Sequence, residues 1–283
     1  MSHSAKSSEL HRVNGPRRAQ VLAVANQKGG VGKTATALHL AAGLARMGQA
    51  VTLIDLDPQG HIELCLQGAL LGKQAQLSRA LLSGDTALEA LVEKTRLPNL
   101  QVVLADPELA ALEPFLAGRI AKEFLLRRAL EGLRQTQTLL VLDCPPSLGV
   151  LTANALAAAD LVIVPCELNL LGLDGLADMV EAIEQTRDFL NRDLTLAGVL
   201  RTRVDARQMA VNAAMEKVLL RRYPQRVLPM AVPFCAEMSK AQMAGWPLFT
   251  TAPSSPAARA YEQLCLALLQ SLGLESTAQV ACA

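Results

Sequence analysis

A glycine-rich stretch near the start of the chain, NQKGGVGKTATALHL at 26–40, carries the residue types that bind phosphate. It contains Gly32-Lys33-Thr34, as the end of the phosphate-binding pattern G-x-x-x-x-G-K-[ST] requires. The first glycine of that pattern is missing, because Gln27 stands in its place. An apolar strand pattern comes before the stretch and helical spacing follows it, which is the context that the pattern needs. The stretch therefore predicts a nucleotide site.

Each residue type in this loop has a physical role at a phosphate. Glycines let the backbone bend so that several N–H groups face the phosphate oxygens, and the following helix adds its positive N-terminal end. Lys33 supplies a charge to the β- and γ-phosphates, and the Thr34 hydroxyl is suited to bind Mg²⁺. The residues predicted to bind the nucleotide here are Gly29, Gly30, Val31, Gly32, Lys33, Thr34 and Ala35.

Acidic residues at the ends of two apolar segments support this site. Asp143 ends an apolar strand, so we expect its carboxylate at the carboxyl edge of the sheet, where such a residue commonly holds Mg²⁺. Asp55 and Asp57 lie two residues apart in a predicted strand, which puts both on one face, toward the phosphates. One of them is expected to position an attacking water, and Thr34, Asp55 and Asp143 are the predicted metal ligands. The alternative for Asp57 is that it merely caps the next helix.

Strand and helix patterns alternate along the chain. The predicted strands are 21–26, 50–60, 101–106, 139–147, 160–165, 196–204 and 226–233, and the predicted helices are 35–48, 119–135 and 256–272. Alternation of this kind predicts an α/β fold with a doubly wound, mostly parallel twisted sheet and helices on both faces. We expect a flexible polar tail at 1–18, a single domain at 19–275 and a second flexible tail at 276–283.

Composition narrows the possible classes of protein. Hydrophobic residues make up 51% of the chain and aromatic residues 3%, so aliphatic side chains must form the core. The net charge of +1 argues against a globally basic nucleic-acid binder but leaves room for a local patch. Six dispersed cysteines without a C-x-x-C pair, and four histidines, favour reduced thiols over a disulfide framework or a zinc site. The polar N-terminus is unlike a secretory signal, and no apolar run reaches the roughly 18 residues of a membrane span.

Three segments together resemble one known family. KGGVGKT, LIDLDPQG and LDCPPSLGVLTANALAAADLVIVP resemble the ParA/MinD group of P-loop ATPases, which share a deviant Walker A loop. The resemblance is strong from about residue 21 to 165 and weaker up to 233 and over 256–272. DLDPQG and DCPPSLG favour the ParA branch, and the chain length resembles the small type, which lacks a large N-terminal DNA-binding domain.

The resemblance implies ATP and Mg²⁺ as cofactors and a homodimer formed with ATP. In that family the additional lysine, here Lys28, reaches the ATP of the partner subunit, where it offsets charge that the interface buries. Asp57 is implied to orient the hydrolytic water, Asp143 to be the Walker B acid and 143–149 to be the switch that senses the γ-phosphate. Lys28, Lys33 and Asp57 are thus the predicted catalytic residues, and Pro233 is expected at the adenine. The alternative for Lys28 is an ordinary surface lysine.

A basic segment is the candidate DNA-binding surface, since ParA-like dimers bind DNA without sequence preference. Residues 201–245 contain eight basic and three acidic residues, a net charge of +5. The candidate DNA-binding residues are Arg201, Arg203, Arg207, Arg221, Arg222 and Lys240. The alternative is a solvated helix face. In PFCAEMSKAQMAG, at 233–245, Glu237 stands where relatives commonly have arginine and Lys240 where they have an acid, so the contacts are expected to differ.

The resemblance implies an ATPase that positions or partitions a plasmid, a chromosome region or a large protein assembly. A ParB-like or other cargo-linked protein is expected to stimulate slow hydrolysis, and the protein to be cytoplasmic and nucleoid-associated, without membrane binding. One alternative is a MinD-like membrane ATPase, which needs a basic amphipathic C-terminal helix, whereas SLGLESTAQVACA has no Lys or Arg. Another is a reductase-type ATPase related to nitrogenase iron protein, but Cys144 has no suitable second cysteine.

Overall fold

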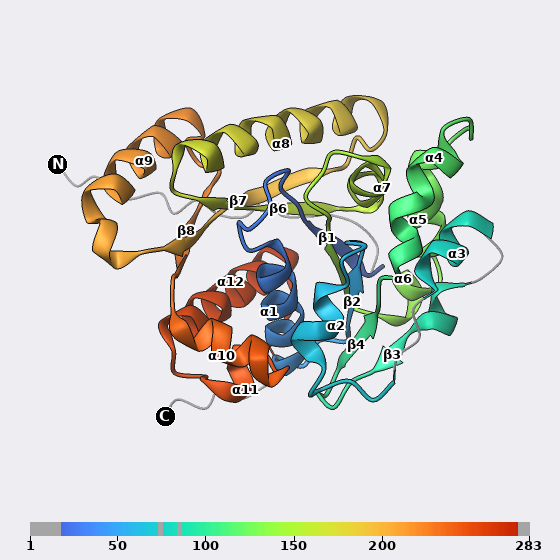
Figure 1. Ribbon diagram of the computed structural model, residues 1–283, viewed down its shortest axis with the longest axis horizontal. Coiled ribbons are helices and arrows are strands. Elements are labelled where there is room, and N and C mark those ends of the chain that lie inside the picture. The colour runs from blue at the N-terminus through green and yellow to red at the C-terminus, as the bar shows by residue number, and fades with distance from the viewer. Residues whose placement is uncertain (1–17, 73–75, 84–86, 277–283) are drawn as a thin grey trace.

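The computed structural model describes residues 18–72, 76–83 and 87–276, and these form an eight-stranded sheet (Figure 1). Its strand order is β3-β4-β2-β5-β1-β6-β7-β8, and only the β3–β4 pair is antiparallel among the pairs of this sheet. The strands are β1 (Gln20–Val24), β2 (Val51–Asp55), β3 (Glu93–Lys94), β4 (Leu100–Val103), β5 (Leu139–Asp143), β6 (Leu161–Glu167), β7 (Thr195–Val204) and β8 (Val227–Pro233). The prediction of a mostly parallel, doubly wound sheet is confirmed.

Helices cover both faces of the sheet (Figure 1). The larger ones are α1 (Lys33–Arg46), α7 (Val150–Ala158), α8 (Leu170–Phe189), α9 (Met209–Arg222), α10 (Ala236–Ala244) and α12 (Pro256–Leu272). The shorter ones include α2 (His61–Leu66), α3 (Leu77–Ser83), α4 (Leu112–Leu116), α5 (Leu125–Ala129), α6 (Leu133–Thr136) and α11 (Leu248–Thr251). One apolar core joins the sheet to α3, α5, α7 and α8, and the other joins it to α1, α2 and α12. Both cores are mostly Leu, Val and Ala, as the composition predicts.

Local sequence explains where the main elements begin and end. The runs VTLID, LLVLD and LVIVPCE are buried along nearly their whole length, as strands covered on both faces must be. Helix α12 starts at Ser255, whose side chain accepts a hydrogen bond from the Ala258 N–H, and ends at Gly273 with a φ of 64°. Helix α1 is followed by Gly48, with a φ of 90°, which confirms the predicted stop.

The strand order places the functional residues at one edge. β1 lies between β5 and β6, so the loop after β1 emerges beside the carboxyl end of β5, at Asp143. β5 also pairs with β2, which sets Asp55 directly opposite Asp143. In open parallel sheets ligands bind at this carboxyl edge, where the order of the strands reverses.

Two predicted elements differ from the structure. The predicted strand 50–60 stops at Asp55, so Asp57 lies in the following turn and not on a strand face. The predicted helix 119–135 is broken into short pieces. The Asn154 side chain accepts from the Leu126 N–H and donates to the Lys122 carbonyl, two groups that a continuous helix pairs with each other. The predicted tails at 1–18 and 276–283 lie almost entirely outside the described residues.

Candidate nucleotide-binding site

The loop between β1 and α1 has the curvature that its glycines permit. Gly30 and Gly32 have φ angles of 78° and 88°, a region that favours glycine. A Cβ atom at Gly29 or Gly30 meets nothing within 4 Å, so the loop borders open space. Gly32 directly precedes the first residue of α1, Lys33, so the positive end of that helix faces the same space.

Polar side chains from neighbouring strands hold this loop in place. The Asn26 amide donates to the Pro165 carbonyl at 2.7 Å, and its oxygen accepts from the Lys28 N–H at 2.9 Å. On the other side, the Thr202 hydroxyl donates to the Val31 carbonyl at 2.7 Å. The loop is therefore fixed to β6 and β7. The sequence reasoning missed Asn26 and Thr202, although both lie near the ends of predicted strands.

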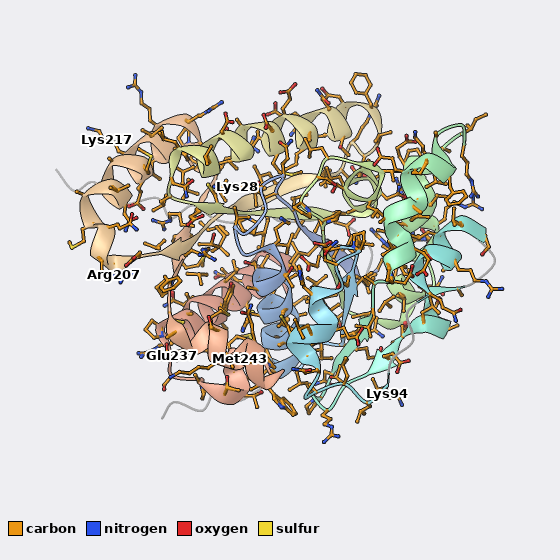
Figure 2. The ribbon with its side chains drawn as sticks, viewed as in Figure 1. Lys28, Lys94, Arg207, Lys217, Glu237 and Met243 are labelled. Atoms are coloured by element: carbon orange, nitrogen blue, oxygen red, sulfur yellow. The ribbon has the colours of Figure 1, made fainter. Side chains whose placement is uncertain are left out.

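The two lysines of the loop lie in different environments. Lys33 is buried, and its Nζ donates to the Lys28 carbonyl at 2.9 Å. Burial lowers the pKa of Lys33, and the nearby Asp143 opposes that shift. Lys28 is half-buried, and its Nζ donates at 3.3 Å to the Asn169 side chain, which caps α8. Figure 2 shows Lys28 on the loop beside α8.

Asp143 is fully buried at the end of β5, and neither of its carboxylate oxygens has a hydrogen-bond partner among the described residues. Burial raises the pKa of Asp143 to about 7, and the neighbouring Thr34 hydroxyl opposes the shift in part. A buried carboxylate without a partner is costly unless it binds a cation. The Thr34 hydroxyl and the Asp143 carboxylate are hard oxygen ligands of the kind that Mg²⁺ prefers, so these residues fit that metal.

The structure gives Asp55 a role other than the predicted metal ligand. Its Oδ1 accepts from the Asp57 N–H at 3.0 Å and its Oδ2 from the Ile62 N–H at 3.2 Å, so both oxygens hold the turn after β2. Burial, together with the nearby Asp143, raises the pKa of Asp55 well above its ordinary value. We correct the prediction accordingly: Asp55 supports the turn, and Thr34 and Asp143 remain as candidate ligands.

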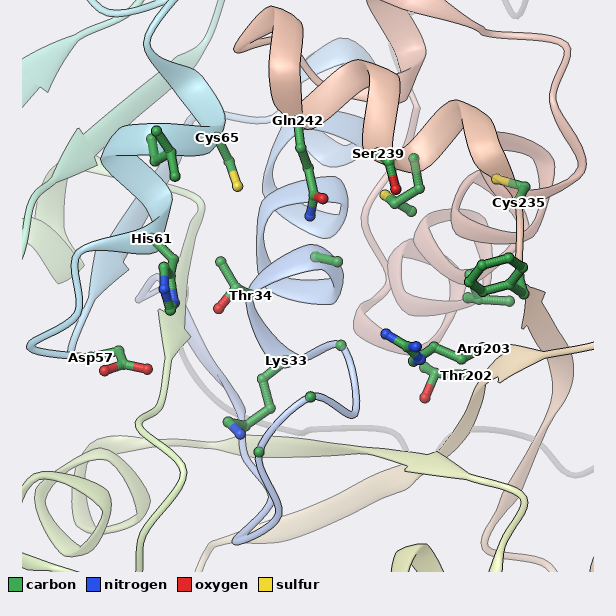
Figure 3. A pocket seen from close by; sticks show the side chains of 18 of the residues that line it. Lys33, Thr34, Asp57, His61, Cys65, Thr202, Arg203, Cys235, Ser239 and Gln242 are labelled. Atoms are coloured by element: carbon green, nitrogen blue, oxygen red, sulfur yellow. The ribbon is translucent and has the colours of Figure 1, made fainter.

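Asp57 is buried, and it lies on the side of Lys33 that is away from β7 (Figure 3). Its Oδ1 accepts from the Gln59 N–H at 3.0 Å within the turn before α2, whereas α2 begins after Gly60 without a side-chain cap, so Asp57 does not cap that helix. Asp57 also lines a cavity of about 780 Å³ and a smaller cavity of about 240 Å³, which is formed with 109–113 and 145–151. Asp57 therefore faces the space beside the phosphate-binding loop, on the side of the phosphates where the sequence pattern predicts it.

A cavity of about 780 Å³ brings most of the predicted nucleotide-binding residues together (Figure 3). Of these residues it is lined by Gly29, Gly30, Gly32, Lys33, Thr34, Ala35 and Pro233, whereas Val31 is buried and does not line it. Asp57, predicted as a catalytic residue, lines it too. Figure 3 shows Asp57 and His61 on one side, Lys33 and Thr34 in the middle, and Thr202, Arg203 and Cys235 on the other. This volume accommodates a nucleotide, with phosphate-binding groups at its centre.

The predicted DNA-binding residues fall into three environments. Arg201 is largely buried: it pairs with Glu216 and donates to the carbonyls of Leu228 and Pro229, so it holds β7, β8 and α9 together and is withdrawn from the predicted DNA surface. Arg203 lines the cavity. Residues 206–222, which consist of a short turn of helix and α9, are here called the α9 segment. Arg207, Arg221 and Arg222 are exposed near its two ends, and Lys240 lies on α10.

Comparison with known proteins settles the family. A family model described as an AAA domain matches residues 19–196. Soj, the sporulation initiation inhibitor protein of Bacillus subtilis, is 36% identical over 245 residues, which cover 87% of this chain and 96% of Soj. The chain belongs to the ParA/MinD family of P-loop ATPases.

Other similar proteins agree with this assignment. The chromosome partitioning protein ParA of Caulobacter vibrioides is 36% identical over 249 residues, which cover 87% of this chain and 92% of ParA. Among solved structures, cobyrinic acid a,c-diamide synthase from Mycobacterium smegmatis, with a bound ATP analogue and magnesium, has a TM-score of 0.77. It is 34% identical, and the match covers 89% of this chain and 95% of that one. Within the described residues, no helix has the length and hydropathy to cross a bilayer.

Proposed function

We propose that this chain is a ParA-like ATPase that binds ATP with Mg²⁺, dimerises over its nucleotides and positions or partitions a cargo. The observation that carries the proposal is the buried Asp143 carboxylate, which has no hydrogen-bond partner among the described residues and lies near Lys33 and Thr34, two residues that line a cavity able to accommodate a nucleotide. The names of Soj and ParA, the second a chromosome partitioning protein, support the positioning role. The ATP analogue and magnesium in the Mycobacterium smegmatis structure support the cofactors.

The loop residues bind the substrate through charge and backbone N–H groups. The Lys33 ammonium, which now donates to the Lys28 carbonyl, gains a stronger acceptor in a phosphate oxygen, because charge-assisted hydrogen bonds exceed neutral ones in strength. Thr34 and Asp143 hold Mg²⁺, which when bound neutralises charge on the phosphates. Asp57 orients the attacking water from the opposite side of the cavity. Slow turnover is stimulated by a ParB-like or other cargo-linked protein.

The surroundings of Lys28 support a dimer that closes over the nucleotides. Lys28 contacts Asn169, and directly after that residue Leu170 and Leu171 expose 75% and 69% of their surface. Leu148, in the predicted switch segment, is 41% exposed. Exposed apolar side chains beside a cation are suited to a protein interface, because a second copy covers the leucines while Lys28 meets the phosphate charge of the partner's ATP.

The α9 segment is the proposed DNA surface. Arg207, Arg221 and Arg222 are exposed there, and Figure 2 shows Arg207 just before α9 and Lys217 on the helix itself. These cations bind phosphates without reading sequence. Lys240 lies apart from these residues, on α10, which packs in the other apolar core. We place the working protein in the cytoplasm on the nucleoid, where ATP-bound dimers coat DNA and release it after hydrolysis.

The test is DNA binding by the ATP-bound protein. Fluorescence anisotropy with random duplex DNA, Mg²⁺ and a non-hydrolysable ATP analogue is expected to show binding that weakens steeply with salt. Arg207→Glu and Arg221→Glu each lower the affinity at every salt concentration and reduce the salt slope by about 1 or more. Lys94→Glu, a matched charge reversal on the far edge of the sheet (Figure 2), leaves binding unchanged.

Two results would contradict the proposed surface. One is full affinity in both α9 variants, which places the DNA site on another part of the molecule. The other is nucleotide-dependent pelleting with anionic lipid vesicles and no DNA binding, which favours the membrane-positioning alternative instead.

A further inference from the structure

A bulge at the end of β7 sets the direction of the Arg203 side chain. Between Arg201 and Val204 the register of β7 against β8 shifts, and Arg203 has a φ of 54°. A residue other than glycine rarely takes this conformation, because its Cβ then crowds the backbone. Bulges and strained residues of this kind concentrate at functional sites, where they redirect side chains. The preceding residue, Thr202, donates to the Val31 carbonyl, so the bulge is tied to the nucleotide loop.

The side chain of Arg203 enters the nucleotide cavity from its wall. Figure 3 shows Arg203 on the side of the cavity away from Asp57, with the guanidinium directed inward. Its Nε lies 3.7 Å from Glu167 Oε1, and its guanidinium carbon lies 5.9 Å from the centroid of the Phe234 ring. The carboxylate and the ring orient the guanidinium, and the side chain keeps 51% of its surface exposed. That surface is available to a molecule in the cavity.

We propose that Arg203 holds the purine base of the bound nucleotide by stacking its guanidinium on the face of the base. This inference deepens the proposed ATP binding and rests on it. Lys33 and Thr34 lie in the middle of the cavity, where the phosphates are proposed to bind, and Arg203 lies on one side of it. Pro233 and Phe234 also line the cavity, and Phe234 contacts Arg203. A guanidinium is planar and weakly hydrated, and it stacks on aromatic faces.

The chemistry of stacking predicts how Arg203 contributes to specificity. Every base presents an aromatic face, so a stacked guanidinium holds adenine and guanine alike and reads neither edge. Arg203 therefore raises affinity for purine nucleotides without setting the preference among them. Its guanidinium also lies beside Glu167, which holds the side chain at the cavity wall. The sequence-based assignment of Arg203 to DNA is replaced by an assignment to the nucleotide.

Calorimetric binding tests this assignment, because the base and the phosphates are separable ligands. Dissociation constants are measured for Mg-ATP, Mg-GTP and Mg-tripolyphosphate with the wild type, Arg203→Ala and Arg203→Lys. Arg203→Ala weakens ATP and GTP binding by the same factor, about threefold to thirtyfold, the range of a cation–π contact. Tripolyphosphate affinity stays unchanged, and Arg203→Lys is intermediate. The control Arg192→Ala, an exposed arginine in the loop after α8, binds all three ligands like the wild type.

Each of the other possible results contradicts a specific part of the proposal. An equal loss of tripolyphosphate affinity assigns Arg203 to the phosphates, and a changed ratio of ATP to GTP affinity assigns it to a base edge; either overturns the proposal. Unchanged ATP affinity with weakened DNA binding returns Arg203 to the DNA surface. Failure of the wild type to bind ATP at all overturns the proposed function itself. Retained tripolyphosphate binding by Arg203→Ala shows that a loss of ATP affinity in that variant does not reflect misfolding.

Discussion

At the scale of single residues, the strongest chemical statement comes from Asp143. Its carboxylate is completely buried and lacks a hydrogen-bond partner among the described residues, so it weakens the folded state when no cation is bound. Such an arrangement persists where function requires it, since stability is commonly given up at sites that must bind charge. The nearby cation is Lys33, and burial lowers the pKa of its ammonium group.

Asp143→Asn is expected to stabilise the protein measured without metal or nucleotide. Removing a buried ionised carboxylate relieves a desolvation cost, which we expect to raise the free energy of unfolding by about 1–2 kcal/mol at pH 8. The stabilisation that Mg-ATP adds to the wild type should disappear. Thermal unfolding in EDTA and in Mg-ATP measures both effects.

Asp160→Asn is the matched control, because Asp160 accepts from the Val21 N–H at 2.7 Å and pairs with Arg134 at 3.3 Å. That variant should lose stability in both conditions. A destabilised Asp143→Asn protein, or one that keeps the full effect of Mg-ATP, would refute the role assigned to Asp143.

At the scale of elements, a buried histidine joins α1 to the C-terminal helices. The His39 Nδ1 lies 2.6 Å from the Ala35 carbonyl, and its Nε2 accepts from the Leu248 N–H at 3.1 Å, an arrangement that requires the neutral ring with the proton on Nδ1. The ring stacks on Tyr261, which in turn bonds with Thr36. Burial lowers the pKa of His39 from 6.5 to about 4.

His39 makes the free energy of unfolding depend on pH between about 4 and 6.5. Between pH 6.5 and about 4 the unfolded state binds a proton on His39 that the folded state does not, so stability falls as the pH falls. The contribution of His39 should shrink by about 3 kcal/mol across this window. Other groups titrate there too, so the measured quantity is the difference between wild-type and His39→Leu unfolding free energies, followed against pH by chemical denaturation.

The exposed His61 provides the comparison for that experiment. His61→Leu should show the pH dependence of the wild type. A difference between wild type and His39→Leu that stays constant from pH 4 to 7 would mean that His39 is charged or exposed in the folded protein.

The elements also show what the sequence allows to be predicted. Buried strands such as β5 and β6 were located because both of their faces are apolar, and the loop after β1 because glycine and lysine spacing reflects local backbone chemistry. The break in the helix predicted over 119–135 was missed, since it depends on the side chain of Asn154, distant in sequence. The family resemblance and the basic charge of its segment predict Arg203 at DNA, because nothing local signals the bulge that turns it into the cavity.

At the scale of the whole molecule, the fold places the nucleotide cavity and the proposed DNA surface on different parts of the protein. The nucleotide cavity opens at the carboxyl edge of the sheet, with Lys28 and the exposed Leu170 and Leu171 beside it. The α9 segment, with Arg207 and Arg221, lies at the β7–β8 end of the sheet (Figures 1 and 2). The proposed dimer carries two α9 segments, so we expect more phosphate contacts and a stronger salt dependence of DNA binding than for one copy.

The central claim is that two copies close over two ATP molecules and that each Lys28 reaches the nucleotide of the other copy. Light scattering coupled to size-exclusion chromatography, with Mg²⁺ and a non-hydrolysable ATP analogue, tests it most directly. Wild type and the control Lys94→Ala are predicted to elute with the mass of a dimer. Lys28→Ala is predicted to bind the analogue and to elute as a monomer; a Lys28→Ala dimer as abundant as that of the wild type would contradict the account.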